Sequence, residues 1–293
     1  MRPIQLTSNG LRFVALELGG GSKTALLLHG FPDNAKSLLP LATILAERGF
    51  RCVVPYMRGY APTERPRQTV TSVATLAADV VGLAAVISRA PVYLIGHDWG
   101  AVAAYAASKL SPEHYAAVCA MSVPPIPAIA ENLPRDPTQL SRSNYIGLFQ
   151  LPQVPERMIK ANDMAFIERL WRRWSPTWEI DEERLADVKS TLAQPGVLRS
   201  ALGYYRSITR GVGGADYRLS ARLLLSPSSA PTQILGGQMD GCMGAELYRG
   251  AERFVHNLSD VHILPEVGHF LPLEATDAVA QRIVSFFEQV DAD

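Results

Sequence analysis

The feature that most constrains the fold of this chain is a Gly-x-Asp-x-Gly pattern formed by Gly96, Asp98 and Gly100. Residues 91–95 before it are mostly apolar β-formers, and residues 101–105 after it are mostly alanine. This order predicts a strand, a sharp turn and a helix. The two glycines allow strand and helix to pack closely around one strained residue. We therefore predict a nucleophile elbow with Asp98 at its tip.

An aspartate at this tip changes the chemistry that the elbow can perform. Serine is the usual residue there and needs a general base, whereas an aspartate is already ionised at neutral pH. Attack by Asp98 would form an ester on its own side chain. Esterase and peptidase functions are excluded because they need the elbow serine.

The composition excludes several classes of partner. Hydrophobic residues make up 47% and charged residues 19%, which is ordinary for a soluble globular protein. At 293 residues the chain can bury one large core, and α/β folds of this length often form a single domain with an insertion. The formal net charge is zero, so we expect no nucleic acid and no membrane partner. A small-molecule substrate is expected instead. The sequence does not decide between a monomer and a homodimer.

The cysteines and the first residues of the chain indicate the cellular compartment in which the protein is expected. The three cysteines have no metal-ligand spacing, which indicates reduced core thiols, and we expect neither a metal nor a cofactor. The first residues lack the apolar run of a signal peptide, and no apolar stretch reaches the ~18 residues of a membrane span. The expected location is the cytoplasm.

Strand and helix patterns alternate along most of the chain. A β-hairpin is predicted over residues 3–18, and further strands are predicted over 23–28, 51–55, 91–95, 115–121, 231–236 and 261–264. Helices are predicted over 37–48, 71–88, 155–174, 243–254 and 276–290. This alternation predicts an α/β fold with a mostly parallel sheet covered by helices on both faces.

The alternation is interrupted after the strand that ends near residue 121. Prolines crowd the next stretch, a helical pattern follows over 155–174, and the alternation resumes only at residue 231. We expect residues 125–225 to form a helical lid over the carboxyl ends of the strands, where α/β sheets place their sites. The core domain is then made of residues 1–124 and 226–293.

Three residues in the order nucleophile, acid and histidine each follow a predicted strand. They are Asp98, Asp240 and His269. The Asp240 carboxylate can accept a hydrogen bond from the histidine and fix its tautomer. Alternatively, Asp240 could only cap the helix that follows it. The remaining histidines are interpreted as packing or hydrogen-bonding residues (His29, His97) or as surface or satisfied groups (His114, His256, His262).

Together these motifs resemble the α/β-hydrolase superfamily, and specifically its soluble epoxide hydrolases, over nearly the whole chain. The matching pieces are His29-Gly30-Phe31-Pro32, Arg58-Gly59-Tyr60, Gly96-His97-Asp98-Trp99-Gly100, Asp240 and Gly268-His269. The resemblance implies that a small apolar epoxide is opened to a vicinal diol through an ester on Asp98. It also implies an oxyanion hole formed by the backbone N–H groups of Phe31 and Trp99.

The resemblance further implies two lid tyrosines that donate to the epoxide oxygen. Tyr145, in the segment 144–152, matches the first, and Tyr205, which precedes an arginine, matches the second. Tyr204 could exchange roles with Tyr205, and a packing role for either position stays open. The tryptophans at 171, 174 and 178 are interpreted as the core of the lid.

Other functions on the same fold remain as alternatives. A haloalkane dehalogenase also uses an aspartate nucleophile, but Phe31 occupies a position where many of these enzymes have a donor side chain. A fluoroacetate dehalogenase carries an arginine in the place of Trp99. A non-catalytic ligand-binding homologue would have no use for Asp98, Asp240 and His269 together.

Overall fold

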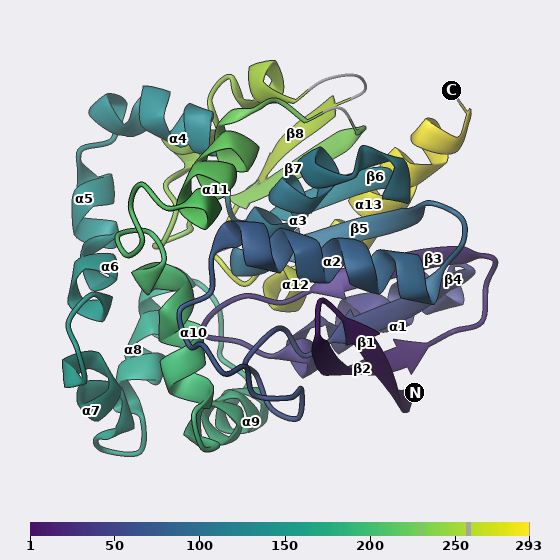
Figure 1. Cartoon of the computed structure of the whole chain (residues 1–293). Coiled ribbons are helices and arrows are strands. Elements are labelled where there is room, and N and C mark those ends of the chain that lie inside the picture. Colours follow the sequence, from purple (N-terminus) through teal and green to yellow (C-terminus); the bar gives the residue numbers. More distant parts are fainter. Residues whose placement is uncertain (229, 256–258, 293) are drawn as a thin grey trace.

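An eight-stranded sheet forms the centre of the protein (Figure 1). The computed structural model describes residues 1–228, 230–255 and 259–292, so His256 lies outside the described residues. The strand order is β1-β2-β4-β3-β5-β6-β7-β8, and all pairs from β4 to β8 are parallel. The strands are β1 (Arg2–Ser8), β2 (Leu11–Leu18), β3 (Lys23–Leu28), β4 (Phe50–Pro55), β5 (Val92–His97), β6 (Tyr115–Met121), β7 (Thr232–Gly237) and β8 (Ser259–Leu264).

The first two strands form the predicted hairpin at the edge of the sheet. Asn9 and Gly10 connect them with φ values of 45° and 71°. Two consecutive positive φ angles define the primed turn that matches the twist of antiparallel strands. β2 also pairs antiparallel with β4, so the hairpin is fixed to the parallel part of the sheet.

Helices cover both faces of the sheet (Figure 1). On one face, α2 (Val73–Ile87) packs against α3 (Trp99–Leu110), and on the other α1 (Leu39–Glu47) packs against α12 (Leu271–Glu274) and α13 (Thr276–Ala292). The predicted fold class, an α/β fold with a mostly parallel sheet, is confirmed. The short 3-10 helices are η1 (Ala35–Leu38), η2 (Pro112–His114), η3 (Leu133–Arg135), η4 (Ala245–Tyr248) and η5 (Ala251–Phe254).

A run of helices separates β6 from β7. They are α4 (Ile126–Asn132), α5 (Thr138–Arg142), α6 (Asn144–Phe149), α7 (Val154–Lys160), α8 (Ala165–Trp174), α9 (Glu182–Ala193), α10 (Val197–Arg206) and α11 (Ala215–Leu225). In Figure 1, α5 to α10 lie together beyond the ends of the strands. α11 differs from them because it packs against α2 and α3.

Two helices predicted from the sequence are wrong in detail. The helix predicted over 155–174 is divided into α7 and α8, because Asn162, Asp163 and Met164 have φ values of 50°, 51° and 54° and interrupt the helical hydrogen bonds. The helix predicted over 243–254 consists of η4 and η5, which are separated by Gly250 at φ 71°.

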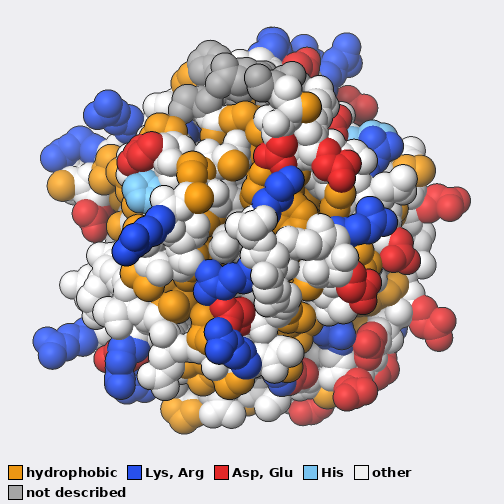
Figure 2. All heavy atoms as spheres, turned by 90° about the vertical axis from the view of Figure 1, so that its right-hand side faces the viewer, with side chains coloured by type: hydrophobic (Ala, Val, Ile, Leu, Met, Phe, Trp, Pro, Cys, Tyr) orange, Lys and Arg blue, Asp and Glu red, His pale blue; other side chains and the backbone are white. Residues whose placement is uncertain are grey.

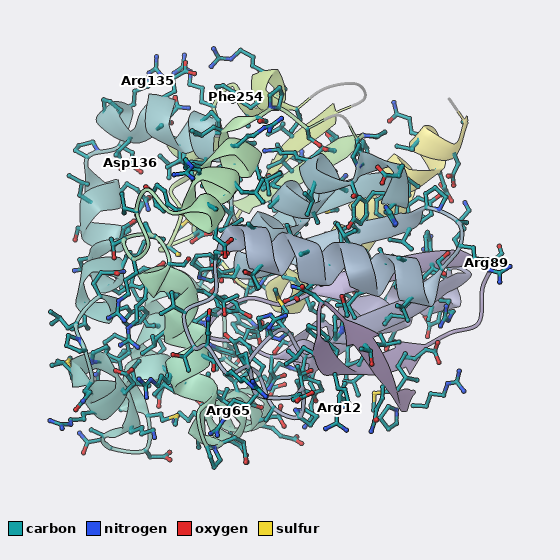
Figure 3. All side chains as sticks on the ribbon, viewed as in Figure 1. Arg12, Arg65, Arg89, Arg135, Asp136 and Phe254 are labelled. Carbon is teal, nitrogen blue, oxygen red and sulfur yellow. The ribbon has the colours of Figure 1, made fainter. Side chains whose placement is uncertain are left out.

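The surface carries charges of both signs, in keeping with the zero net charge. Figure 2 shows acidic and basic side chains interspersed on one face, and Figure 3 shows Arg12, Arg89 and Arg135 at the edge of the molecule. Across the part of the chain that the structure describes, no helix combines the length and the apolar character needed to span a bilayer.

Candidate active site

The elbow at Asp98 has the geometry that its glycines require. Asp98 connects β5 to α3 with φ 51° and ψ −118°, a conformation that costs about 1–3 kcal/mol for a residue other than glycine. A Cβ atom on Gly96 would lie 2.2 Å from the oxygen of Gly100, and one on Gly100 would lie 2.1 Å from the oxygen of Leu28. Only glycine therefore fits at either position. The strained turn presents the Asp98 carboxylate at the carboxyl end of the sheet.

The loop after β3 brings a backbone amide to this carboxylate. The Phe31 N–H donates to Asp98 Oδ1 at 2.8 Å. A Cβ atom on Gly30 would lie 2.4 Å from the Asp98 side chain, so the glycine permits this close approach. Trp99 is the first residue of α3, and its N–H has no preceding helical carbonyl as a partner. Two backbone donors thus flank Asp98.

His269 lies between the two carboxylates that the sequence paired with it. Its Nδ1 is 2.9 Å from Asp240 Oδ2, and its Nε2 is 3.6 Å from Asp98 Oδ2. Nε2 is buried and has no hydrogen-bond partner among the described residues. The other oxygen of Asp240 accepts from the N–H groups of Cys242 and Met243 at 2.6 and 2.9 Å. The acid is thus fixed in orientation, and Nε2 is left to contact Asp98 or a water.

The charge on His269 depends on these neighbours. Burial alone would lower the pKa of His269, but the negative charges of Asp240 and Asp98 outweigh burial and raise this pKa from 6.5 to about 10. His97, which also contacts this loop, is different because burial and the positive charge of His269 lower its pKa to about 4. With Asp98 ionised, His269 therefore carries a proton at neutral pH.

The backbone of His269 is held on both sides. Its N–H donates to the Trp174 oxygen at 3.1 Å and to Ser175 Oγ at 3.0 Å, which ties the loop to the end of α8. Its carbonyl accepts from Ser122 Oγ at 2.6 Å and lies 2.9 Å from His97 Nε2. The structure therefore places His97 in the hydrogen-bonding position expected for it.

Both candidate tyrosines reach this region from separate helices. Tyr205 on α10 packs edge-on against the rings of Phe31 and Trp99, with centroids 5.5 and 5.1 Å away. Tyr145 on α6 lies 5.6 Å from Tyr205 between ring centroids. The Tyr204 hydroxyl instead donates to the Arg58 oxygen at 2.6 Å. Adjacent helical positions thus have different environments, and Tyr205 is the one that faces Phe31.

The hydroxyl groups of these two tyrosines stay protonated. Burial, with the neighbouring thiol of Cys242 and the Asp98 carboxylate, raises the pKa of Tyr145 well above its usual value, and burial and Asp98 do the same for Tyr205. The Tyr205 hydroxyl is buried and has no hydrogen-bond partner among the described residues. It is therefore a donor available to a bound molecule.

Sequence reasoning missed residues that surround the acid. One of them is Cys242, because the potential ligand atoms of Asp240, Cys242 and His269 all lie within 4.8 Å of one another. Such a cluster could hold a metal, but the hydrogen bond between Asp240 and His269 already accounts for its closeness. The position of Cys242 two residues after the acid, where an aspartate commonly accepts from the backbone, was the available signal.

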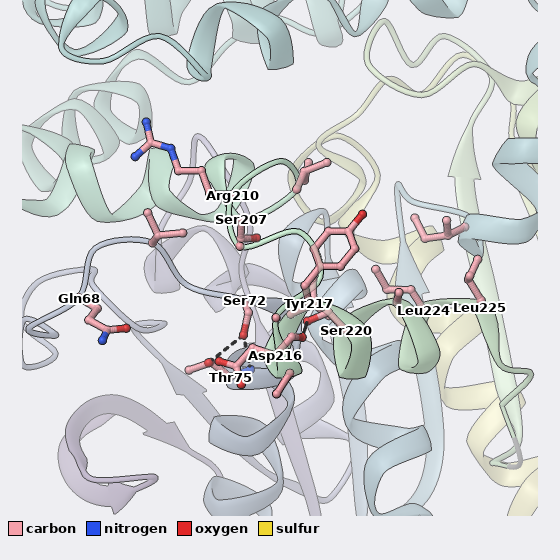
Figure 4. A pocket seen from close by; sticks show the side chains of 18 residues that line it. Gln68, Ser72, Thr75, Ser207, Arg210, Asp216, Tyr217, Ser220, Leu224 and Leu225 are labelled. Carbon is pink, nitrogen blue, oxygen red and sulfur yellow. Dashed lines mark hydrogen bonds between the residues drawn. The ribbon is translucent and has the colours of Figure 1, made fainter.

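A separate cavity of about 630 Å³ lies between the start of α2, the segment 207–214 and α11 (Figure 4). Its lining is mainly apolar and includes Ile126, Tyr217 and Leu224. None of the seven candidate site residues lines it. The candidate active site is instead the closed region around Asp98.

Comparison with known proteins identifies the class. Residues 25–282 match the model of the alpha/beta hydrolase family, and the chain belongs to that family. It is 26% identical over 266 residues to the AB hydrolase superfamily protein YfhM of Bacillus subtilis, with 90% of this chain and 89% of that protein covered.

Epoxide hydrolases are prominent among the similar proteins. The chain is 28% identical over 287 residues to Epoxide hydrolase 3 of Mus musculus, with 97% of this chain and 76% of that protein covered. The crystal structure of a putative epoxide hydrolase from Klebsiella pneumoniae is 25% identical and superposes with a TM-score of 0.83, covering 98% of this chain and 97% of the other. The resemblance to the epoxide hydrolase type within the family is confirmed.

Proposed function

We propose that this protein is an epoxide hydrolase that converts small apolar epoxides to vicinal diols through an ester on Asp98. The observation that carries the proposal is the buried Tyr205 hydroxyl, which lacks a partner among the described residues and lies on a ring packed against Phe31 and Trp99. An epoxide needs a proton donor for its oxygen while a nucleophile attacks its carbon. The names of the similar epoxide hydrolases support the same activity.

In the first step, Asp98 attacks a ring carbon. The Phe31 N–H fixes Oδ1, which leaves Oδ2 for the attack. As the new carbon–oxygen bond forms, the ring carbon–oxygen bond breaks and its electron pair takes a proton from Tyr145 or Tyr205. The products are a hydroxyalkyl ester on Asp98 and a tyrosinate.

The ester then changes the charge of the site. Asp98 loses its negative charge on alkylation, so one of the two carboxylates that raise the pKa of His269 is removed. The proton of His269 becomes available to the tyrosinate, directly or through solvent, and the imidazole becomes neutral. His269 is thereby converted from a cation to a general base only after the ester has formed.

In the second step, this base activates water. His269, oriented by Asp240, removes a proton from a water that attacks the carbonyl carbon of Asp98. The developing oxyanion on Oδ1 is stabilised by the amides of Phe31 and Trp99, and such donors typically contribute about 10²- to 10³-fold each. Collapse releases the diol and restores the Asp98 carboxylate.

The helices between β6 and β7 fit a lid. We propose residues 125–225 as this lid and residues 1–124 with 226–293 as the core domain. The placement of both tyrosines on α6 and α10, above a nucleophile from the sheet, supports this division. The packing of α11 against α2 and α3 favours moving the second boundary to a position before Ala215.

A haloalkane dehalogenase remains the rival within the same fold. It would need two donors for a departing halide, and the Phe31 side chain offers none. A fluoroacetate dehalogenase is less well supported because Trp99 cannot pair with a carboxylate as an arginine does. A non-catalytic homologue would leave the paired Asp240 and His269 without a role.

Product analysis tests the proposal. The protein is incubated with a panel of epoxides and organohalides, with Asp98→Asn as the control, and diol or halide is measured. We expect diol from the wild-type protein only. Halide release without diol would establish the dehalogenase function instead.

Trapping tests the covalent step. His269→Gln should open epoxides but fail to hydrolyse the ester, so Asp98 should gain the mass of the substrate in a peptide digest. A single turnover of wild-type protein in ¹⁸O-water should put the label into Asp98 and leave the diol unlabelled. Label found only in the diol would show that water attacks the epoxide directly.

A further inference from the structure

The thiol of Cys242 lies between the catalytic acid and one lid tyrosine. Its Sγ is 3.5 Å from Tyr145 Oη, within hydrogen-bonding distance for sulfur. Both residues are almost fully buried. The Tyr205 hydroxyl has no such partner among the described residues. The two tyrosines are therefore not equivalent.

The backbone around Cys242 fixes the position of this sulfur. The Cys242 N–H donates to Asp240 Oδ1 at 2.6 Å, and its carbonyl accepts from Gln139 Nε2 at 2.7 Å. Gln139 belongs to α5 and also accepts from the Gly244 N–H at 3.0 Å. The thiol is thus held by a loop that is bonded to the acid on one side and to a helix of the proposed lid on the other.

The protonation state of the thiol suits a donor. Burial, and then the charges of Asp240 and Asp98, raise the pKa of Cys242 well above its usual value. The sulfur therefore keeps its proton at neutral pH. A neutral thiol is a poor nucleophile, so it does not compete with Asp98 for an electrophilic epoxide.

We propose, on the basis of the proposed function, that Cys242 is a positioning residue that makes Tyr145 the proton donor in ring opening. The Cys242 S–H donates to Tyr145 Oη, and this directs the Tyr145 O–H toward the epoxide oxygen. When the proton moves to that oxygen, the negative charge left on Oη strengthens the S–H hydrogen bond that Oη already accepts. Tyr205 then serves as a hydrogen-bond donor that keeps its own proton.

A double-mutant cycle tests this coupling. The ring-opening rate constant is measured by single-turnover kinetics in wild-type protein, Cys242→Ala, Tyr145→Phe and the double variant. We expect Cys242→Ala to slow ring opening by about three- to tenfold, the effect of one weak hydrogen bond. In the Tyr145→Phe background it should have no further effect, because the acceptor is already missing. Hydrolysis of the ester should be unchanged.

Further variants distinguish positioning from packing. Cys242→Ser keeps a donor and should recover part of the rate, whereas Cys119→Ala removes another fully buried thiol, on β6, and should leave ring opening unchanged. The proposal would be overturned if Cys242→Ala slowed ring opening equally in the wild-type and Tyr145→Phe backgrounds. It would also be overturned if Cys242→Ala alone left the rate unchanged.

A spectroscopic measurement makes the contact testable apart from turnover. The Raman S–H stretching band that Cys242→Ala removes should shift when Tyr145 is replaced by Phe, because the hydrogen bond weakens that stretch. A band that does not shift would overturn the proposed hydrogen bond. Wild-type protein that opens no epoxide would overturn the proposed function instead, and a shifted band would still support the contact.

Discussion

The charge of the nucleophile should set the pKa of the base. Asp98→Asn replaces the carboxylate by a neutral group of the same shape and therefore imitates the charge of the esterified enzyme. In the wild-type protein, Asp98 Oδ2 lies 3.6 Å from His269 Nε2. At such a distance, a unit charge contributes about 4 kcal/mol for an effective dielectric constant near 20. That energy corresponds to about three pKa units.

We expect the pKa of His269 to fall from about 10 by at least one unit, with about three as the upper end. The assay is an NMR titration of histidine-labelled protein, with His269 assigned by its loss in His269→Gln. Asp216→Asn, which removes a carboxylate that lines the separate cavity, is the matched control and should leave the titration unchanged. A His269 pKa that is the same in Asp98→Asn and wild-type protein would refute the switch from cation to base.

The same shift sets a pH dependence of stability. Because the folded state raises the pKa of His269, the stabilisation from its proton is fully present below the unfolded value of 6.5 and is lost as the pH rises toward about 10. In Asp98→Asn this loss should begin at the same pH but be complete at a lower pH, so the total loss of stability should be smaller. Thermal denaturation across this pH range measures the difference.

The remaining predictions concern the proton donors and the elbow. Tyr145→Phe and Tyr205→Phe should each slow ring opening by about 10²-fold in single-turnover kinetics, whereas Tyr204→Phe should not. If Tyr145→Phe and Tyr205→Phe both open epoxides at the wild-type rate, the proposed lid donors are wrong. Gly100→Ala should unfold the protein or destabilise it by several kcal/mol in denaturant titrations, because its Cβ would lie 2.1 Å from a backbone oxygen. Gly147→Ala, with no atom within 4 Å of the added Cβ, should instead stabilise α6 by about 0.5–1 kcal/mol, and equal effects at the two glycines would contradict the packing argument.

The parts of the fold that depend on local sequence were predictable. The elbow and the strands are marked by glycines and apolar runs, and Asp98, Asp240 and His269 each follow a strand. Parallel strands present their carboxyl ends at one edge of a sheet, so the topology alone predicts that these three side chains lie close together. The positions of these three residues therefore needed no knowledge of side-chain packing.

Features that depend on packing between distant segments could not be predicted. The division between Tyr204 and Tyr205 rests on the rotation of α10, since adjacent helical residues point about 100° apart. The break between α7 and α8 contains neither glycine nor proline, and its asparagine and aspartate are only a weak signal of left-handed backbone. The contact from Cys242 to Tyr145 joins residues 97 positions apart.

The strained backbone at Asp98 also bears on how this sequence could drift over evolutionary time. Glycine adopts φ 51° and ψ −118° without a steric penalty, so the backbone of this turn by itself favours glycine over aspartate. The aspartate offsets that strain through its side chain, which accepts from the Phe31 N–H and faces His269. A chain that lost either of these partners would keep the strain without the compensating contact, and an exchange of Asp98 for glycine would then cost its fold little.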